Sequence, residues 1–216
     1  MVKFNNPFVE YHLEVPEMPA HVYLFPDILK VIDNLNESRQ STILDVGCGG
    51  GAFLDALYKR GFRKIYGFDS SVSGIAVAKK NFSHLMDNYF VHSAYDERLP
   101  NELPRQFDII TSTEVIEHLY SPKTYLTNLR HWLKDDGYLI ISTPYHGYLK
   151  NLGIALLGGF DNHFNSIYDG EHIKFVSKRT INKLLADNGF QLVKFQGSGR
   201  APFLWRSMIL LIKKRL

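Results

Sequence analysis

The sequence predicts an α/β protein built around a doubly wound, mostly parallel sheet. Short apolar runs alternate with stretches whose apolar residues recur three and four positions apart, so strands should alternate with helices. The strand-like runs are apolar throughout, as in parallel sheets that helices cover on both faces. A glycine-rich segment at 43–57, ILDVGCGGGAFLDAL, follows the first run and opens a helix, which is the nucleotide-binding arrangement of such sheets.

The elements follow one another in a regular order. The apolar spacing of residues 22–35 predicts a first helix against the core. Helices should also begin at residue 51, ended by Gly61, and after a cap at Ser70 or Ser71. A fourth helix should start near Pro122, and residues 135–137 (DDG) should form a turn. Five strands are predicted between these elements, at residues 42–46, 64–69, 88–93, 107–113 and 138–143.

The pattern changes after Pro144. Residues 145–175 are rich in Gly, Asn, His and aromatic residues without a clean period, which indicates an insertion or lid. A helix capped by Ser177 and Gly189 should follow. Two final strands, FQLVKFQG and PFLWRSMILLIKK, are joined by a segment short enough for an antiparallel hairpin. We therefore expect a single domain over residues 1–216 that carries one insertion.

Composition excludes several classes of protein. The chain has 216 residues, 45% of them hydrophobic, and its net charge of +3 is too mild to predict nucleic-acid binding. Cys48 is the only cysteine, so no internal disulfide forms, and we interpret it as a small filler. No signal-peptide-like run or membrane-spanning window occurs, so a cytoplasmic protein is expected. The apolar C-terminal run before Lys213 is interpreted as a buried strand, with a lipid-contacting surface as the alternative.

The glycine loop alone is a weak signal, because Gly47, Gly49 and Ala52 would also suit a dinucleotide enzyme. Asp45 lies two residues before the loop, where a carboxylate would repel a pyrophosphate but attract an ammonium group. Asp69 ends the second strand, where a carboxylate can accept hydrogen bonds from ribose hydroxyls. The acid- and histidine-rich segment TSTEVIEH ends the fourth strand at the same edge. Together these features favour S-adenosylmethionine as the ligand.

The motifs DVGCGGG, GFDSS, FDIITSTEVIEHL and GYLIISTP, in this order, resemble the class I S-adenosylmethionine-dependent methyltransferases. Within that class the chain is most similar to the small-molecule O-methyltransferases related to the ubiquinone-biosynthesis enzymes. The resemblance covers roughly residues 40 to 200. It implies a seven-stranded, Rossmann-like sheet whose last strand is antiparallel, which agrees with the terminal hairpin read from the residues.

The resemblance also implies the cofactor-binding residues. Ser93 and Ala94 stand where the family usually has Gly-Asp, beside the adenine. The full set carried over is Asp45, Gly47, Gly49, Gly51, Asp69, Ser70, Ala94, Tyr95, Thr113 and Glu114.

Candidate bases come from the histidines. His118 lies four residues after Glu114, one helical turn onward, so both could face one pocket, and His146 ranks second. Glu117 is interpreted as a solvated helix charge. The spacing of His146, His163 and His172 fits no standard zinc pattern, so no metal is expected.

The sequence thus predicts methyl transfer to a small-molecule acceptor, and a hydroxyl oxygen is favoured because it needs a base. The alternatives are a nicotinamide-dependent oxidoreductase and a catalytically silent module that binds S-adenosylmethionine. A monomer or homodimer is expected. Apolar residues of the insertion could contact a membrane or pack on the core; they are Leu149, Leu152, Ile154, Leu156 and Leu157.

Overall fold

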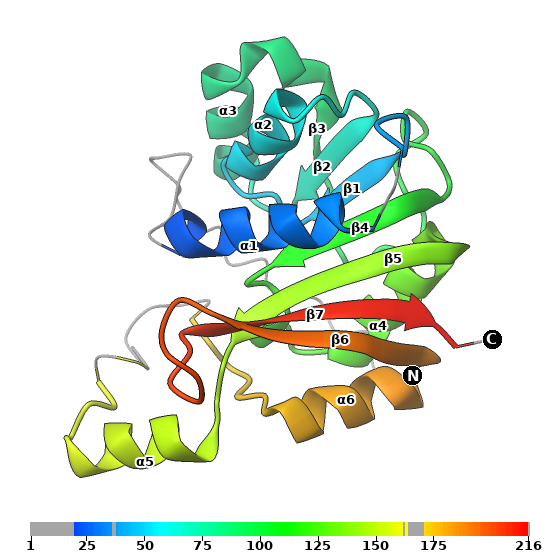
Figure 1. Ribbon diagram of the computed structural model, residues 1–216. Helices are drawn as coiled ribbons and strands as arrows, with labels where there is room; N and C mark the ends of the chain where they lie inside the picture. Colours follow the sequence, from blue (N-terminus) through cyan, green and yellow to red (C-terminus); the bar gives the residue numbers. More distant parts are fainter. Residues whose placement is uncertain (1–19, 36–37, 162, 164–170, 216) are drawn as a thin grey trace.

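The computed structural model describes residues 20–35, 38–161, 163 and 171–215 (Figure 1). A seven-stranded sheet with the strand order β3-β2-β1-β4-β5-β7-β6 forms its centre. The predicted absence of a signal peptide concerns residues that lie outside this description. The strands are β1 (Ile43–Val46), β2 (Ile65–Asp69), β3 (Tyr89–Val91), β4 (Phe107–Thr113), β5 (Leu133–Pro144), β6 (Phe190–Ser198) and β7 (Ser207–Lys214).

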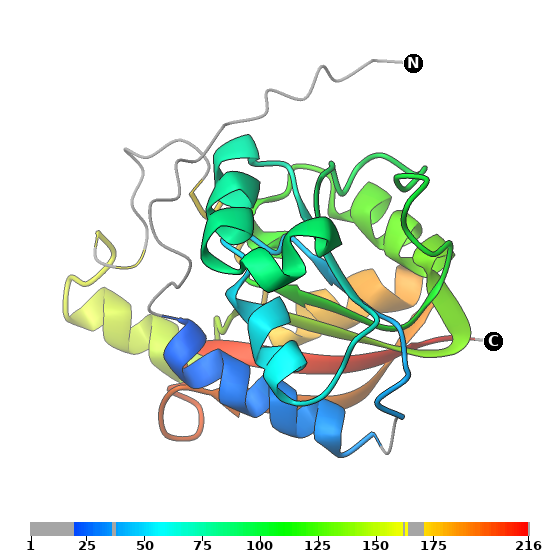
Figure 2. The same ribbon diagram turned by 90° about the horizontal axis from the view of Figure 1, so that it is seen from above.

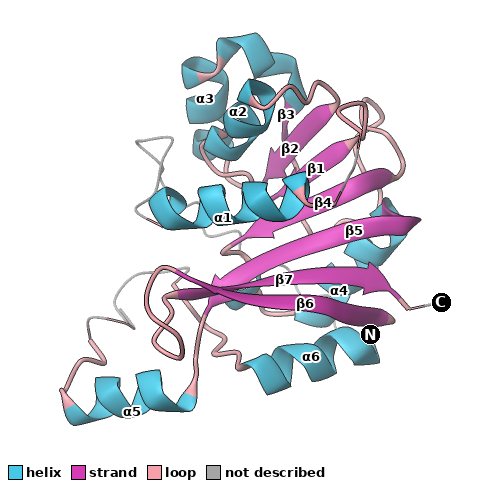
Figure 3. Ribbon diagram, in the orientation of Figure 1, coloured by secondary structure: helices cyan, strands magenta, loops and turns pink. Residues whose placement is uncertain are grey.

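Helices cover both faces of the sheet, as the apolar strands predicted (Figures 1 and 3). Ile43 packs with α1, α2 and α3 on one face, and the next residue, Leu44, packs with α4 and α6 on the other. The α-helices are α1 (His21–Asp33), α2 (Ala52–Lys59), α3 (Val72–Asn81), α4 (Pro122–Trp132), α5 (Tyr148–Leu156) and α6 (Lys178–Asp187). Two short 3-10 helices complete the set, η1 (Ser83–Asn88) and η2 (Ile116–His118).

The C-terminal hairpin is confirmed. β7 runs antiparallel to both of its neighbours, β5 and β6, whereas β1 to β5 pair in parallel. β7 lies between β5 and β6, so its apolar side chains are buried inside the sheet. Lys214 at its end is buried and donates to the carboxylate of Asp135 at 2.9 Å. The buried-strand interpretation of this run is therefore correct.

The structure decides between the two cap candidates of α3 and corrects one predicted turn. Of Ser70 and Ser71, it is Ser71 that caps α3, because its Oγ accepts a hydrogen bond from the Gly74 amide at 2.9 Å. The turn expected at residues 135–137 is absorbed into β5, which begins directly after α4 at Leu133. The pairing register with β4 shifts there, from Phe107 opposite Leu133 to Ile109 opposite Tyr138. An irregular strand takes the place of the turn because α4 ends at Trp132 and β5 begins at the next residue.

The insertion contains a helix that projects from the sheet. α5 follows β5 and lies beside the end of the β6–β7 hairpin, away from the other helices (Figures 1 and 2). Several of its apolar side chains are exposed, and Ile154 alone in this helix is buried. Among the described helices, none is both long and apolar enough to cross a bilayer.

The glycine turn between β1 and α2 is shaped by the protein itself. Gly47, Gly49 and Gly51 all have positive φ, at 77°, 49° and 84°. A Cβ on Gly47 would lie 2.4 Å from Val115 Cγ2, and one on Gly51 would lie 2.7 Å from the Cβ of Ala78. Packing therefore excludes side chains at Gly47 and Gly51, in addition to any demand from a ligand.

We expect Gly51→Ala to be more destabilising than Gly61→Ala. Both residues have positive φ, but a Cβ on Gly61 would meet nothing within 4 Å. Gly61→Ala should lower the free energy of unfolding by about 1–2 kcal/mol, the backbone cost alone. Gly51→Ala should lower it by a further 1–3 kcal/mol or so, because the methyl group is forced against Ala78 and Tyr89. Urea unfolding measures both, and equal losses would contradict the packing explanation.

Candidate active site

The predicted cofactor residues meet where the parallel strands end. β1 pairs with β2 on one side and with β4 on the other, so the strand order reverses beside β1. Ligands of doubly wound sheets bind at the carboxyl ends of the strands at such a reversal. Asp45, Asp69 and Thr113 lie at or near the ends of β1, β2 and β4. The fold thus brings the sequence-predicted acids to one edge.

Asp69 holds the glycine turn onto β2. Its carboxylate is buried and accepts hydrogen bonds from two backbone amides, Gly49 at 2.9 Å and Ser71 at 2.8 Å. Ser70 lies between Asp69 and Ser71 in the chain, directly after the strand. The carboxylate therefore holds the glycine loop and the residues that precede α3 in place, which is a structural role. Its contact with a ribose stays a prediction.

Asp45 is buried beneath the same turn. The Thr111 hydroxyl donates to its carboxylate at 2.7 Å. Burial, with a smaller contribution from the charge of Asp69, raises the pKa of Asp45 to about 7. No lysine or arginine forms an ion pair with Asp45 among the described residues.

Thr113 and Glu114 end β4 in a strained conformation. Glu114 has a φ of 54°, which is uncommon for a residue with a side chain and often marks a functional site. Its carboxylate accepts hydrogen bonds from the hydroxyls of Ser142 at 3.0 Å and Ser207 at 3.2 Å. Burial raises the pKa of Glu114 to about 7. The Thr113 hydroxyl is buried with no hydrogen-bond partner in the described part of the chain, so a polar ligand atom would satisfy it.

Glu117 corrects the sequence analysis. It is fully buried, not a solvated helix charge, and the Thr143 hydroxyl donates to its carboxylate at 2.9 Å. Burial, reinforced by the charge of Glu114, raises the pKa of Glu117 well above its usual value. The α-helical turn expected between Glu114 and His118 is absent too, because the left-handed φ of Glu114 leads into the short 3-10 helix η2.

Histidines gather beside Glu117. The rings of His118 and His172 lie 4.9 Å apart, and His172 Nε2 is 4.0 Å from the carboxylate of Glu117. One ligand atom from each of Glu117, His118 and His172 falls within 4.8 Å of the others, so one divalent cation could be held there. The spacing of residues along the chain could not reveal this set. The expectation that no metal binds stays a prediction, and loss of activity on treatment with EDTA would contradict it.

His146, the second candidate base, lies on the same side. Its ring packs edge-on against Phe175 with centroids 5.4 Å apart. Burial, with the charge of Lys150, lowers the pKa of His146 to about 4. A histidine with this pKa is neutral at pH 7, as a proton acceptor must be. His163 Nδ1 lies 3.0 Å from the Gly159 carbonyl oxygen and can donate a hydrogen bond to it.

The residues predicted to line the adenine follow β3. Asn128 donates to the Ala94 carbonyl at 3.0 Å, and the Ser121 amide donates to the Tyr95 hydroxyl at 3.2 Å. The Ser93 hydroxyl accepts a hydrogen bond from the Tyr95 amide at 3.2 Å. This loop is thus fixed to α4 and to the segment before it, and its contact with an adenine stays a prediction.

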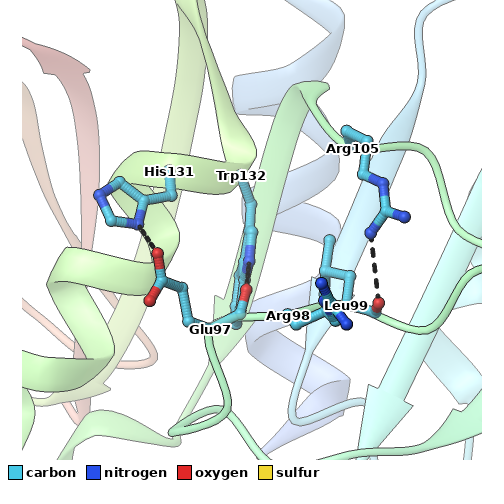
Figure 4. A pocket seen from close by; sticks show the side chains of 6 residues that line it. All are labelled: Glu97, Arg98, Leu99, Arg105, His131 and Trp132. Atoms are coloured by element: carbon cyan, nitrogen blue, oxygen red, sulfur yellow. Dashed lines mark hydrogen bonds and ion pairs between the residues drawn. The ribbon is translucent and has the colours of Figure 1, made fainter.

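The surface pocket in Figure 4 lies elsewhere. It has a volume of about 300 Å³ and is lined by residues 97–99, Arg105, His131 and Trp132 (Figure 4). These residues adjoin the end of α4 and the start of β4, at the edge of the sheet opposite the acids. Two of its charged residues already have partners, since Glu97 pairs with His131 at 3.2 Å and Arg105 donates to the Leu99 carbonyl at 3.5 Å. We assign it no function.

Comparison with known proteins identifies the family. The family described as "Methyltransferase domain" matches residues 20–194, which is most of the chain. The chain belongs to this family. This chain is 30% identical to the ubiquinone biosynthesis O-methyltransferase of Rickettsia canadensis over 179 residues. The match covers 79% of this chain and 71% of the Rickettsia protein. The protein of the same name from Bradyrhizobium diazoefficiens is 31% identical, covering 74% of this chain but only 62% of that relative.

Solved structures share the fold of the methyltransferase. An S-adenosylmethionine-dependent methyltransferase from Clostridium acetobutylicum superimposes with a TM-score of 0.68 at 14% identity, over 89% of this chain and 91% of that one. The magnesium protoporphyrin IX methyltransferase of Synechocystis, crystallised with S-adenosylhomocysteine, gives 0.66 at 18% identity, over 89% and 82%. The family match and the shared fold together make the chain a class I, Rossmann-like methyltransferase that uses S-adenosylmethionine, and they exclude the nicotinamide-dependent alternative.

The site fits this cofactor. S-adenosylmethionine carries a sulfonium and an ammonium group, both of them cationic. At the carboxyl ends of the strands, Asp45 and Glu114 are buried, and burial disfavours their charged forms. Asp45 and Glu114 have no lysine or arginine ion pair within the described residues, so a cationic ligand would supply the missing compensation. The unsatisfied Thr113 hydroxyl offers one further polar contact.

The buried acids predict how stability changes with pH in the cofactor-free protein. A carboxyl whose pKa rises on folding binds its proton more tightly in the folded state, so the free energy of unfolding should fall as pH rises from about 4, near the unfolded pKa, to about 7, the folded pKa of Asp45. One such group contributes at most about 1.4 kcal/mol per pH unit. Asp45→Asn should flatten this slope, whereas Asp136→Asn, at an exposed position, should not. Urea unfolding at several pH values tests it, and an unchanged slope in Asp45→Asn would refute the assignment.

Proposed function

We propose that the methyltransferase transfers the methyl group of S-adenosylmethionine to a hydroxyl oxygen of a small organic acceptor. The observation that carries this proposal is the group of histidines beside the strand ends, His118, His146 and His172. A hydroxyl must lose a proton when it attacks the methyl group, and a neutral imidazole can take it. The relatives from Bradyrhizobium diazoefficiens and Rickettsia canadensis are O-methyltransferases by name, which supports the same acceptor atom.

In this proposal separate groups of residues bind the cofactor and take the proton of the acceptor. Asp45, Asp69 and the glycine turn bind the cofactor beside β1 and β2, with Thr113 and Glu114 near its methionine part. His118 takes the proton of the acceptor, and His146 is the second candidate. The cofactor supplies an activated methyl group, so the protein mainly positions the two reactants and excludes water.

The insertion is proposed to cover the acceptor. Residues 145–175 include α5 and His146, and the segment that follows returns to the site, where the amides of Ile173 and Lys174 donate to the Glu117 carbonyl at 3.0 and 2.9 Å. His172 is thereby held against His118. These contacts support a lid over residues 145–175 that is anchored at the catalytic edge.

His118→Ala tests the proposed base. Methyl transfer from labelled S-adenosylmethionine to a panel of phenols and catechols should slow by ~10²–10⁴-fold, the usual contribution of a general base. The affinity for S-adenosylhomocysteine, measured by calorimetry, should change little, because the proposed adenosyl contacts lie elsewhere. His131→Ala is the matched control, since His131 is half-exposed at the other edge of the sheet.

The outcomes separate the alternatives. A variant that keeps the parent's rate would make His118 a packing residue and His146 the next candidate. A parent protein that binds S-adenosylhomocysteine but methylates no panel member, nor a wider set of hydroxylated acceptors, would favour the catalytically silent module instead.

We also propose that this cytoplasmic protein contacts membranes through α5. Leu149, Leu152, Leu156 and Leu157 are exposed, the last by 86%, whereas Ile154 packs inward. Replacing both Leu156 and Leu157 by Glu should lower the fraction that co-sediments with phosphatidylcholine–phosphatidylglycerol vesicles several-fold, because apolar burial drives such binding. Val193→Glu, at an exposed position of β6, is the control. Failure of the parent protein to sediment, or no loss in the double variant, would refute the contact.

A further inference from the structure

Three basic side chains gather where α5 meets the C-terminal hairpin. Lys150 lies on α5, and Arg200 and Arg206 lie in the connection between β6 and β7. The Lys150 ammonium group donates to the Tyr145 carbonyl at 2.9 Å and to the Arg206 carbonyl at 3.2 Å. The Arg206 guanidinium lies 5.6 Å from the centre of the Tyr23 ring. The cluster therefore joins α5, the hairpin and α1 at one point.

This cluster carries positive charge that the described residues do not neutralise. Burial, together with the charges of Arg200 and Arg206, lowers the pKa of Lys150 to about 8. Lys150, Arg200 and Arg206 form no ion pair within 4 Å in the part of the chain that the structure describes. Within the described residues the ammonium group donates to two carbonyl oxygens, which do not cancel its charge.

The cluster faces the acceptor side of the site. The charge of Glu114 acts on Lys150, and that of Lys150 contributes to the lowered pKa values of His146 and His172, behind burial in each case. Ser207, next to Arg206, donates to Glu114. Asp45 and Asp69, proposed for the cofactor, lie on β1 and β2, whereas the cluster adjoins β5 and β7. The cluster therefore lies apart from the acids proposed for the adenosyl end of the cofactor, and an anion on the acceptor would reach it beside the histidines. S-adenosylhomocysteine carries the methionine carboxylate of the cofactor, so saturating the protein with it keeps that carboxylate out of a comparison between acceptors.

We propose that Lys150, with Arg200 and Arg206, binds an acidic group, a carboxylate or a phosphate, on the methyl acceptor. This inference rests on the proposed function, because it assigns the substrate class of that site. Arginine offers a planar fork that matches such anions, and lysine adds a compact charge. An acidic acceptor supplies the counter-charge that the cluster lacks and is held beside the histidines.

The test measures binding with the full chain saturated with S-adenosylhomocysteine. Calorimetry compares 3,4-dihydroxybenzoate with 3,4-dihydroxybenzamide, which differ in the charged group alone. The parent should bind the acid about tenfold or more tightly than the amide, as a charge-assisted contact implies. Lys150→Met should abolish this preference and Lys150→Arg should retain it. Lys183→Met, at an exposed position of α6, should also leave it unchanged.

Equal affinities for the acid and the amide in the parent, or an unchanged preference in Lys150→Met, would overturn the proposal. The proposal would also be overturned if the parent protein bound neither 3,4-dihydroxybenzoate nor inorganic phosphate. Should Lys150→Met fail to fold by circular dichroism, Arg206→Gln replaces it, because Arg206 is exposed and its loss should lower the same preference several-fold.

Two further arms keep the interpretations apart. An anionic lipid headgroup offers the same chemistry, so binding to phosphatidylglycerol vesicles that depends on Lys150, with no preference for the acid over the amide, would assign the cluster to lipid and overturn the proposal. Methyl transfer is measured separately. An acid preference that depends on Lys150 without transfer to any hydroxyl would contradict the proposed function and leave the anion site standing.

Discussion

The burial of carboxylates at the ends of the strands is the constraint on which the site depends. Each acid is held by donors from neighbouring strands or turns: Asp45 by Thr111, Asp69 by two amides, Glu117 by Thr143. Hydrogen bonds recover only part of the hydration that a buried anion loses, which is why the pKa values of Asp45 and Glu117 rise. The edge is therefore arranged for positive charge, and a family that uses a sulfonium cofactor meets that requirement.

The sheet separates two electrostatic environments. The acids of β1 and β2 lie on one side of the strand-order reversal, and the basic cluster around Lys150 lies beyond β5, next to β7. Glu114 stands between them, bonded to serines of β5 and β7 and influenced by Lys150. A cationic donor and an acidic acceptor would each approach the side that suits its charge.

Much of this could be predicted from the sequence because it depends on local patterns. Apolar runs, glycine stops and caps located the strands and helices, and the spacing of Asp45 and Asp69 around the glycine turn placed both acids correctly. Glu117 could not be judged in this way, since a three-residue 3-10 helix has no periodicity that reports burial. The contacts Glu114–Ser207 and His118–His172 join residues that are far apart in the sequence, so no local sequence pattern predicts them.

The position of β7 has a consequence for the order of assembly during synthesis. β7 follows β6 in the chain but is inserted between β6 and β5. Until residues 207–214 have left the ribosome, β5 presents an unpaired edge of apolar residues and Glu114 lacks its contact with Ser207. The nascent chain can thus pair β1 to β5 first, whereas β6 joins the sheet only after β7, the last strand, is available between β5 and β6.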